Sequence, residues 1–140
     1  MGCDIHAHVE VKIDGEWLHW SALDIRRCYE LFAKMANVRN YEDDDGRIVP
    51  ISEPRGIPAD VTDLTKMDSD RWDSDAHSQS WLSAQEMEVA YNWIHSYYPR
   101  STDFLGLFGY VFGNYPWDFD EEDLQPASVT DARLVFWFDN

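Results

Sequence analysis

The feature that most constrains the fold is a strict alternation of apolar and polar residues near the start of the chain. In residues 3–13, CDIHAHVEVKI, the odd positions are apolar and the even positions carry two carboxylates, two imidazoles and one lysine. A period of two is typical of a β-strand that buries one face. Asp14-Gly15 follows and is a strong signal for a two-residue hairpin, so residues 16–22 are predicted to form the partner strand.

Two helices are predicted from apolar spacing and capping residues. Residues 25–37 place apolar side chains at helical spacing, with Asp24 as the N-cap and an asparagine as the last residue. Ser83 and Glu86 have the spacing of a capping box, in which each side chain accepts from the backbone of the other. That box predicts a second helix over residues 84–97.

The patterns of the remaining segments complete the prediction of the fold class. Residues 38–62 are predicted to be a loop, because their prolines remove backbone donors and fix φ. Residues 73–81, DSDAHSQSW, are predicted to be a polar loop just ahead of the second helix. Residues 131–138 form a nearly continuous apolar run, which is typical of an interior strand. We therefore expect an α+β fold, a small antiparallel or mixed sheet with two main helices packed on one face, and a free polar face on the first strand.

Composition limits the classes of function. The 140 residues predict a single domain, 1–140, with 44% apolar residues and 15% aromatics. Eleven basic residues against 27 acidic ones give a net charge of −16. Such a field repels nucleic acid phosphates, so no direct nucleic-acid binding is expected, and it attracts cations and basic proteins. We expect a cytoplasmic protein without membrane contact, because the sequence has only two cysteines, no apolar run of membrane-spanning length and no signal peptide.

The polar face of the first strand is a candidate metal site. Asp4, His6 and His8 alternate along one face, and two imidazoles at this spacing with a carboxylate are ligands that suit Zn or Mn. The string D-I-H-A-H resembles the first-strand D-x-H-x-H motif of amidohydrolases and of polymerase-and-histidinol-phosphatase type phosphoesterases. That resemblance covers five residues, and 140 residues do not build the large barrels of those families. The alternative is a solvated sheet face of pairing charges.

A second candidate group lies in and around the segment 73–81. His77 is expected as a further metal ligand and as a catalytic residue, with Ser78 and Ser80 donating to a phosphate. Arg55, between two prolines, is expected to bind substrate and to stabilise developing negative charge. The alternatives are that the serines are ordinary turn residues and that Arg55 neutralises Glu53 or Asp60.

Four segments carry a wider resemblance. MGCDIH, PRGIP, DAHSQSWL and VFWFDN are similar to segments of a group of small uncharacterised proteins encoded by phages and prophages. The resemblance implies a phage accessory protein in the cytoplasm of a bacterial host, and it implies no particular reaction. It draws attention to Asp4, His6, Arg55, His77 and Trp81, whereas His8 falls outside the matching segment.

Three hypotheses of function remain. The first is a metal-assisted hydrolase of a phosphate ester or nucleotide, in which the metal activates water. The second is a non-catalytic acidic inhibitor that mimics nucleic acid and occupies the groove of a host defence or nucleic-acid enzyme. The third is a protein that sequesters a nucleotide. The strand face favours the first, whereas acidic runs at 42–45, 68–75 and 118–123 favour the second. No role is assigned to the aromatic segment 104–117.

Overall fold

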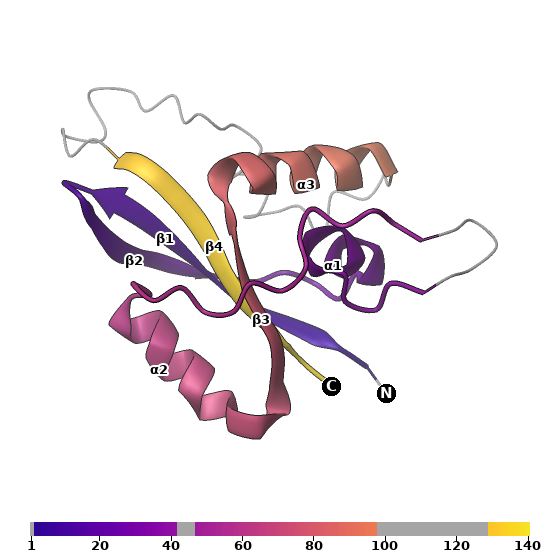
Figure 1. Ribbon diagram of the computed structural model, residues 1–140, viewed down its shortest axis with the longest axis horizontal. Helices are drawn as coiled ribbons and strands as arrows, with labels where there is room; N and C mark the ends of the chain where they lie inside the picture. The colour runs from indigo at the N-terminus through magenta and orange to yellow at the C-terminus, as the bar shows by residue number, and fades with distance from the viewer. Residues whose placement is uncertain (1, 42–46, 98–128) are drawn as a thin grey trace.

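The computed structural model describes residues 2–41, 47–97 and 129–140, and it has the expected α+β architecture (Figure 1). The acidic runs 42–45 and 118–123 and the aromatic segment 104–117 lie outside these residues. No described helix has both the length and the apolar character needed to cross a membrane.

Four strands form one antiparallel sheet, in the order β2-β1-β4-β3. The first two strands are joined by the predicted hairpin at Asp14-Gly15, where both residues have positive φ, 51° and 83°, as a type I′ turn requires. The long apolar strand lies in the interior of the sheet, as expected. The strands are β1 (Asp4–Ile13), β2 (Glu16–Leu23), β3 (Ala76–Ser83) and β4 (Val129–Asp139).

The two expected helices build the main core on one face of the sheet (Figure 1). Helix α1 (Tyr29–Ala36) and helix α3 (Ala84–Tyr97) bury apolar side chains against the apolar face of β1 and β4. Helix α3 has the predicted bounds, and its capping box is formed: the Ser83 amide donates to Glu86 Oε1 at 3.0 Å, and the Glu86 amide donates to Ser83 Oγ at 3.2 Å.

Helix α1 ends where predicted but begins later. Asn37 stops it in the left-handed conformation, with φ 58°. The N-cap is Cys28 rather than Asp24, and its backbone is extended, with φ −149°. The extended backbone before the helix carries Arg27, whose guanidinium reaches Asp4.

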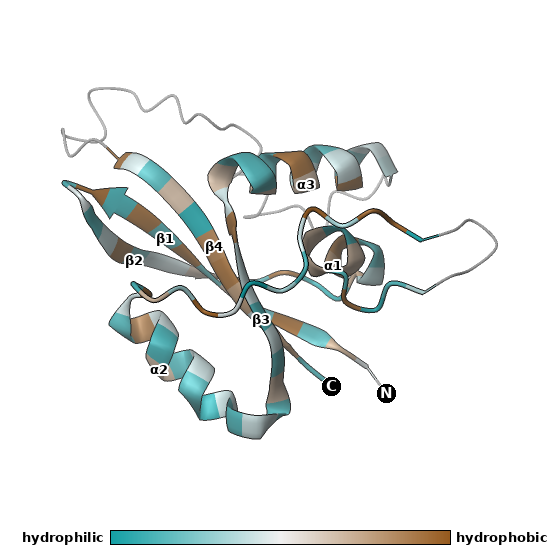
Figure 2. Cartoon of the chain, in the orientation of Figure 1, coloured by the Kyte–Doolittle hydropathy of each residue, from teal (hydrophilic) through white to brown (hydrophobic). Residues whose placement is uncertain are grey.

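The prediction for residues 73–81 was wrong, and the sequence had predicted no element for the residues just before them. Residues 73–81 are not a loop, because β3 begins at Ala76 and pairs with β4 at the far edge of the sheet. A third helix, α2 (Asp63–Trp72), precedes it and lies on the face of the sheet opposite α1 and α3 (Figure 1). Its residues are mostly hydrophilic (Figure 2), so no apolar periodicity signalled it. The polar face of β1 is therefore covered rather than free.

Candidate functional site

The layer between α2 and the sheet is rich in buried polar side chains. The buried residues of α2 are Thr65 and Ser69, whereas its apolar Leu64 and Met67 are exposed. Across from them, His8 and Glu10 of β1 are 5% and 0% exposed. Because buried polar groups need hydrogen-bond partners, this layer depends on a specific network as well as on the packing of the buried Trp137 ring.

Glu10 lies at the centre of that network. Its carboxylate accepts from Arg133 Nε at 2.9 Å, and from the backbone N–H and hydroxyl of Thr62 at 2.9 and 2.5 Å. Thr62 is the N-cap residue of α2, so Glu10 fixes both the start of that helix and the central strand β4. Arg133 also donates to Asp60 at 2.8 Å, and this hydrogen bond lowers the pKa of the Asp60 carboxyl.

A second chain of contacts joins two histidines to α2. His8 Nε2 lies 2.7 Å from the Asp68 carboxylate, and His8 Nδ1 lies 2.9 Å from His19 Nε2. Because a carboxylate only accepts, His8 donates through Nε2, and a neutral His8 then accepts at Nδ1 from His19. Burial is the main cause that lowers the pKa of His19, and the neighbouring His8 lowers it further.

His6 is held in an aromatic stack at the other end of α2. Its Nε2 lies 2.6 Å from Asp139, and its ring lies 4.0 Å from the ring of Trp72, measured between centroids. The buried Trp137 ring stacks on both His6 and His8, at 6.1 and 5.6 Å. The Trp137 indole N–H has no hydrogen-bond partner among the described residues.

The residues expected to share a metal do not meet at one point. The strand pairing places His6 beside Trp137 and His77 beside Phe138, so the two histidines point to opposite faces of the sheet. Asp4 is paired with Arg27 through two hydrogen bonds of 2.9 and 3.0 Å. Within residues 2–41, 47–97 and 129–140, no group of three His, Cys, Asp or Glu side chains is arranged to hold a metal ion. The ligand roles of Asp4, His6, His8 and His77 stay a prediction.

His77 and its neighbours belong to an edge strand. The His77 ring contacts the Ser78 hydroxyl at 2.9 Å and Asn140 at 3.1 Å, and it stacks on Phe138. Ser78 has a positive φ of 55° at an irregularity in the pairing. Ser80 is fully buried and accepts from the Arg55 amide at 3.0 Å. The described contacts of these side chains are therefore internal.

Arg55 is also held by the fold. Its guanidinium donates to both carboxylate oxygens of Glu86 at 2.7 and 2.6 Å, and it lies 4.7 Å from the centre of the Trp81 ring. The hydrogen bonds from Arg55 lower the pKa of Glu86. Arg55 thus neutralises a carboxylate, but that of Glu86 rather than that of Glu53 or Asp60, and it ties the proline-rich loop to α3.

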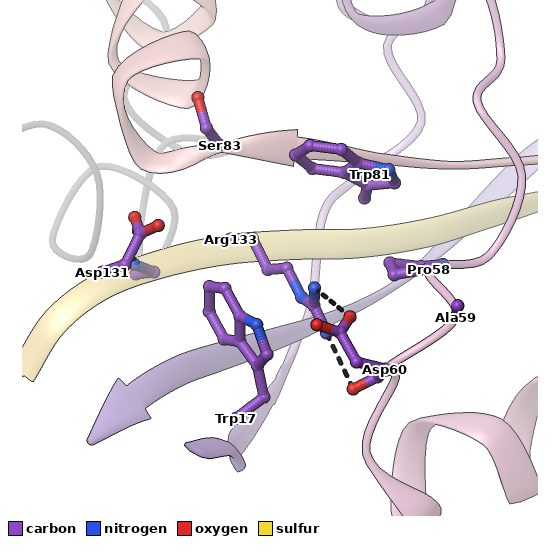
Figure 3. A pocket seen from close by; sticks show the side chains of 9 residues that line it. Trp17, Pro58, Ala59, Asp60, Trp81, Ser83, Asp131 and Arg133 are labelled. Carbon is purple, nitrogen blue, oxygen red and sulfur yellow. Dashed lines mark hydrogen bonds and ion pairs between the residues drawn. The ribbon is translucent and has the colours of Figure 1, made fainter. Parts of the chain in front are cut away.

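One pocket opens on the α2 side of the sheet, beyond the start of that helix (Figure 3). Its volume is about 590 Å³, within the range of small-molecule sites. Trp17 from β2 and Trp81 from β3 stand on either side of Arg133, whose guanidinium carbon lies 3.9 Å from the centre of the Trp17 ring. The remaining lining residues are Pro58, Ala59, Asp60, Ser83, Asp131 and Ala132.

Sequence reasoning missed most of this pocket. The resemblance draws attention to Trp81, but Trp17 is predicted only to lie in the partner strand, residues 16–22. One signal was present: Arg133 is the basic residue inside the apolar run of β4, and Glu10 is the acidic residue in the second half of β1. A buried arginine in a strand calls for a buried carboxylate, and the two lie directly opposite each other in the sheet.

Comparisons with known proteins add no relative: no family model, curated protein or solved structure matches this chain.

Proposed function

We propose that this protein acts by binding, and that its partner is a protein with a basic surface, such as the surface with which an enzyme binds nucleic acid. This corresponds to the acidic inhibitor among the three hypotheses. In a phage accessory protein, such binding would block a host enzyme without any reaction.

The observation that carries the proposal is that basic side chains are paired within the fold, whereas many exposed carboxylates are not. Five basic side chains form ion pairs with carboxylates of the same chain: Arg27, Arg55, Lys66, Arg71 and Arg133. By contrast, seven exposed carboxylates form no ion pair within the described part of the chain. They are Asp14, Glu16, Asp24, Glu53, Asp63, Asp73 and Asp75. The negative charge is thus displayed on the surface, where it steers a basic partner.

The groups that a hydrolase would need are engaged internally, which also supports a binding role. Arg55 is bound by Glu86, Asp4 by Arg27, and His6 by Asp139. His8 lies beneath α2. A catalytic group must reach its substrate within hydrogen-bond distance, and these side chains already direct their polar atoms at protein partners.

The test is retention of proteins from a bacterial lysate by the immobilised chain. At low salt we expect a basic, nucleic-acid-binding protein to be retained, and at 1 M salt we expect it to be released, because the Debye length falls from about 10 Å at 0.1 M to about 3 Å. The variant Asp63→Asn, Asp73→Asn, Asp75→Asn should retain less of it. Asn92→Ala, a change at an exposed neutral residue of α3, is the matched control and should retain the same amount.

Two results would contradict the proposal. One is that no basic protein is retained at low salt. The other is that a retained protein is held equally by the triple variant and at 1 M salt, since contacts of that kind would not depend on the surface carboxylates.

A further inference from the structure

We infer that the pocket between Trp17 and Trp81 receives a planar cation, the guanidinium of an arginine side chain on the partner. This inference rests on the proposed function and names the group that the partner inserts. At this pocket an aromatic wall and partly exposed carboxylates occur together (Figure 3).

The chain itself shows twice how such a group is held. Arg133 lies over Trp17 and pairs with Glu10 and Asp60, and Arg55 lies over Trp81 and pairs with Glu86. In both cases a guanidinium rests on an indole face while a carboxylate accepts from its edge, the combination that guanidinium geometry favours. Trp81 lines the pocket, whereas Arg55 is not among the residues that line it.

Two carboxylates at the pocket have room for further donors. Asp60 binds Arg133 through Oδ1, and its side chain is 64% exposed, which leaves the carboxylate room to accept from a further donor. Asp131 accepts from the Ala132 amide through Oδ1, and it also lines the pocket. A guanidinium has five donors in one plane, and it can reach carboxylates and an indole face at the same time.

The charge balance favours a cation over an anion. Arg133 is 5% exposed and is matched by the fully buried Glu10. The Lys12 ammonium attracts the Asp60 carboxylate, and its Nζ lies 5.7 Å from the centre of the Trp17 ring. With Asp60 and Asp131 added, three carboxylates stand against two cations, inside a molecule of net charge −16. A phosphate group would meet repulsion here, whereas an arginine side chain would be attracted.

The test is a titration of the full-length ¹⁵N-labelled chain with N-acetyl-arginine amide at constant ionic strength. The indole N–H signals of Trp17 and Trp81 are assigned with the variants Trp17→Phe and Trp81→Phe. We expect both signals to shift and to saturate. N-acetyl-citrulline amide, a neutral isostere of the arginine probe, should bind at least about tenfold more weakly, because each lost charge-assisted hydrogen bond is worth about 1.4 kcal/mol or more.

A pair of isosteric variants locates the site without removing a tryptophan. Asp60→Asn with Asp131→Asn keeps the pocket shape and should weaken the arginine probe about tenfold. Glu30→Gln with Glu88→Gln removes the same charge from positions outside the pocket and should leave the affinity unchanged. Equal binding of citrulline and arginine, equal binding of N-acetyl-lysine amide, or no saturable indole shift would each overturn the inference. Retention of a basic protein in a salt-dependent way would then still stand, so the two proposals fail separately.

Discussion

The buried pair of Glu10 and Arg133 supplies the sharpest test of the polar layer. Replacing Glu10 with methionine keeps a similar length but removes every acceptor that Arg133 Nε and the Thr62 amide use. Breaking a buried pair costs about 3–5 kcal/mol, and about 3 applies here because Asp60 still binds Arg133. Loss of the acceptor at the start of α2 adds about 1 kcal/mol. We therefore expect Glu10→Met to lower the free energy of unfolding by about 4 kcal/mol.

The assay is urea unfolding at pH 7, followed by tryptophan fluorescence, with free energies compared at equal slope. The double variant Glu10→Met with Arg133→Met should lose only about 2 kcal/mol, because no charge is then buried without a partner. A single variant that loses less than about 1 kcal/mol would behave like an exposed salt bridge. A double variant that loses the sum of both single changes would show that the pair is not coupled. Either result would refute the reasoning.

Three further predictions concern one capping hydrogen bond, one histidine and the two cysteines. Ser83→Ala should destabilise the fold by about 1 kcal/mol in the same urea assay, because it removes half of the capping box of α3. Burial lowers the pKa of His19 below 6.5, so the unfolded chain takes up a proton at His19 before the folded chain does as the pH falls. The free energy of unfolding should therefore decrease below about pH 6.5. His19→Gln should reduce that decrease in unfolding curves measured at about pH 5–8. Burial raises the pKa of both thiols, Cys3 and Cys28, so a colourimetric thiol reagent should react with them only after unfolding.

Local patterns predicted the elements that have strong local signals. The alternation in β1, the Asp14-Gly15 turn, the continuous apolar β4 and the capping box at Ser83 each depend on neighbours within a few residues, and each is present as expected. The predicted fold class and the placement of two helices on one face followed from these elements.

Helix α2 and strand β3 were missed because their stabilisation is not local. The side of α2 that faces the sheet carries Thr65, Asp68 and Ser69, which resemble solvent-exposed residues until His8 and Glu10 are known to lie opposite. Strand β3 has mixed polarity because it lies at the edge of the sheet, where its pairing with β4 decides its conformation.

The candidate site was harder still to predict, because residues far apart in the sequence form it. The polar face of β1 was predicted from the sequence, but its His8 and Glu10 side chains form hydrogen bonds with α2 and its N-cap. The pocket is lined by residues of β2, β3, β4 and the loop before α2. The cross-strand position of Trp17 and Trp81 depends on the strand order β2-β1-β4-β3, which no local pattern determines.

The most direct test of the central claim is a competition between this protein and DNA for the basic protein that it retains. The retained protein is purified, bound to a fluorescently labelled duplex, and titrated with the full-length chain at fixed salt. The account predicts that the duplex is displaced as the chain is added, and that the Asp63→Asn, Asp73→Asn, Asp75→Asn variant displaces it less well than Asn92→Ala does. A duplex that stays bound while the chain also binds would contradict the account, since the acidic surface would then not occupy the nucleic-acid site.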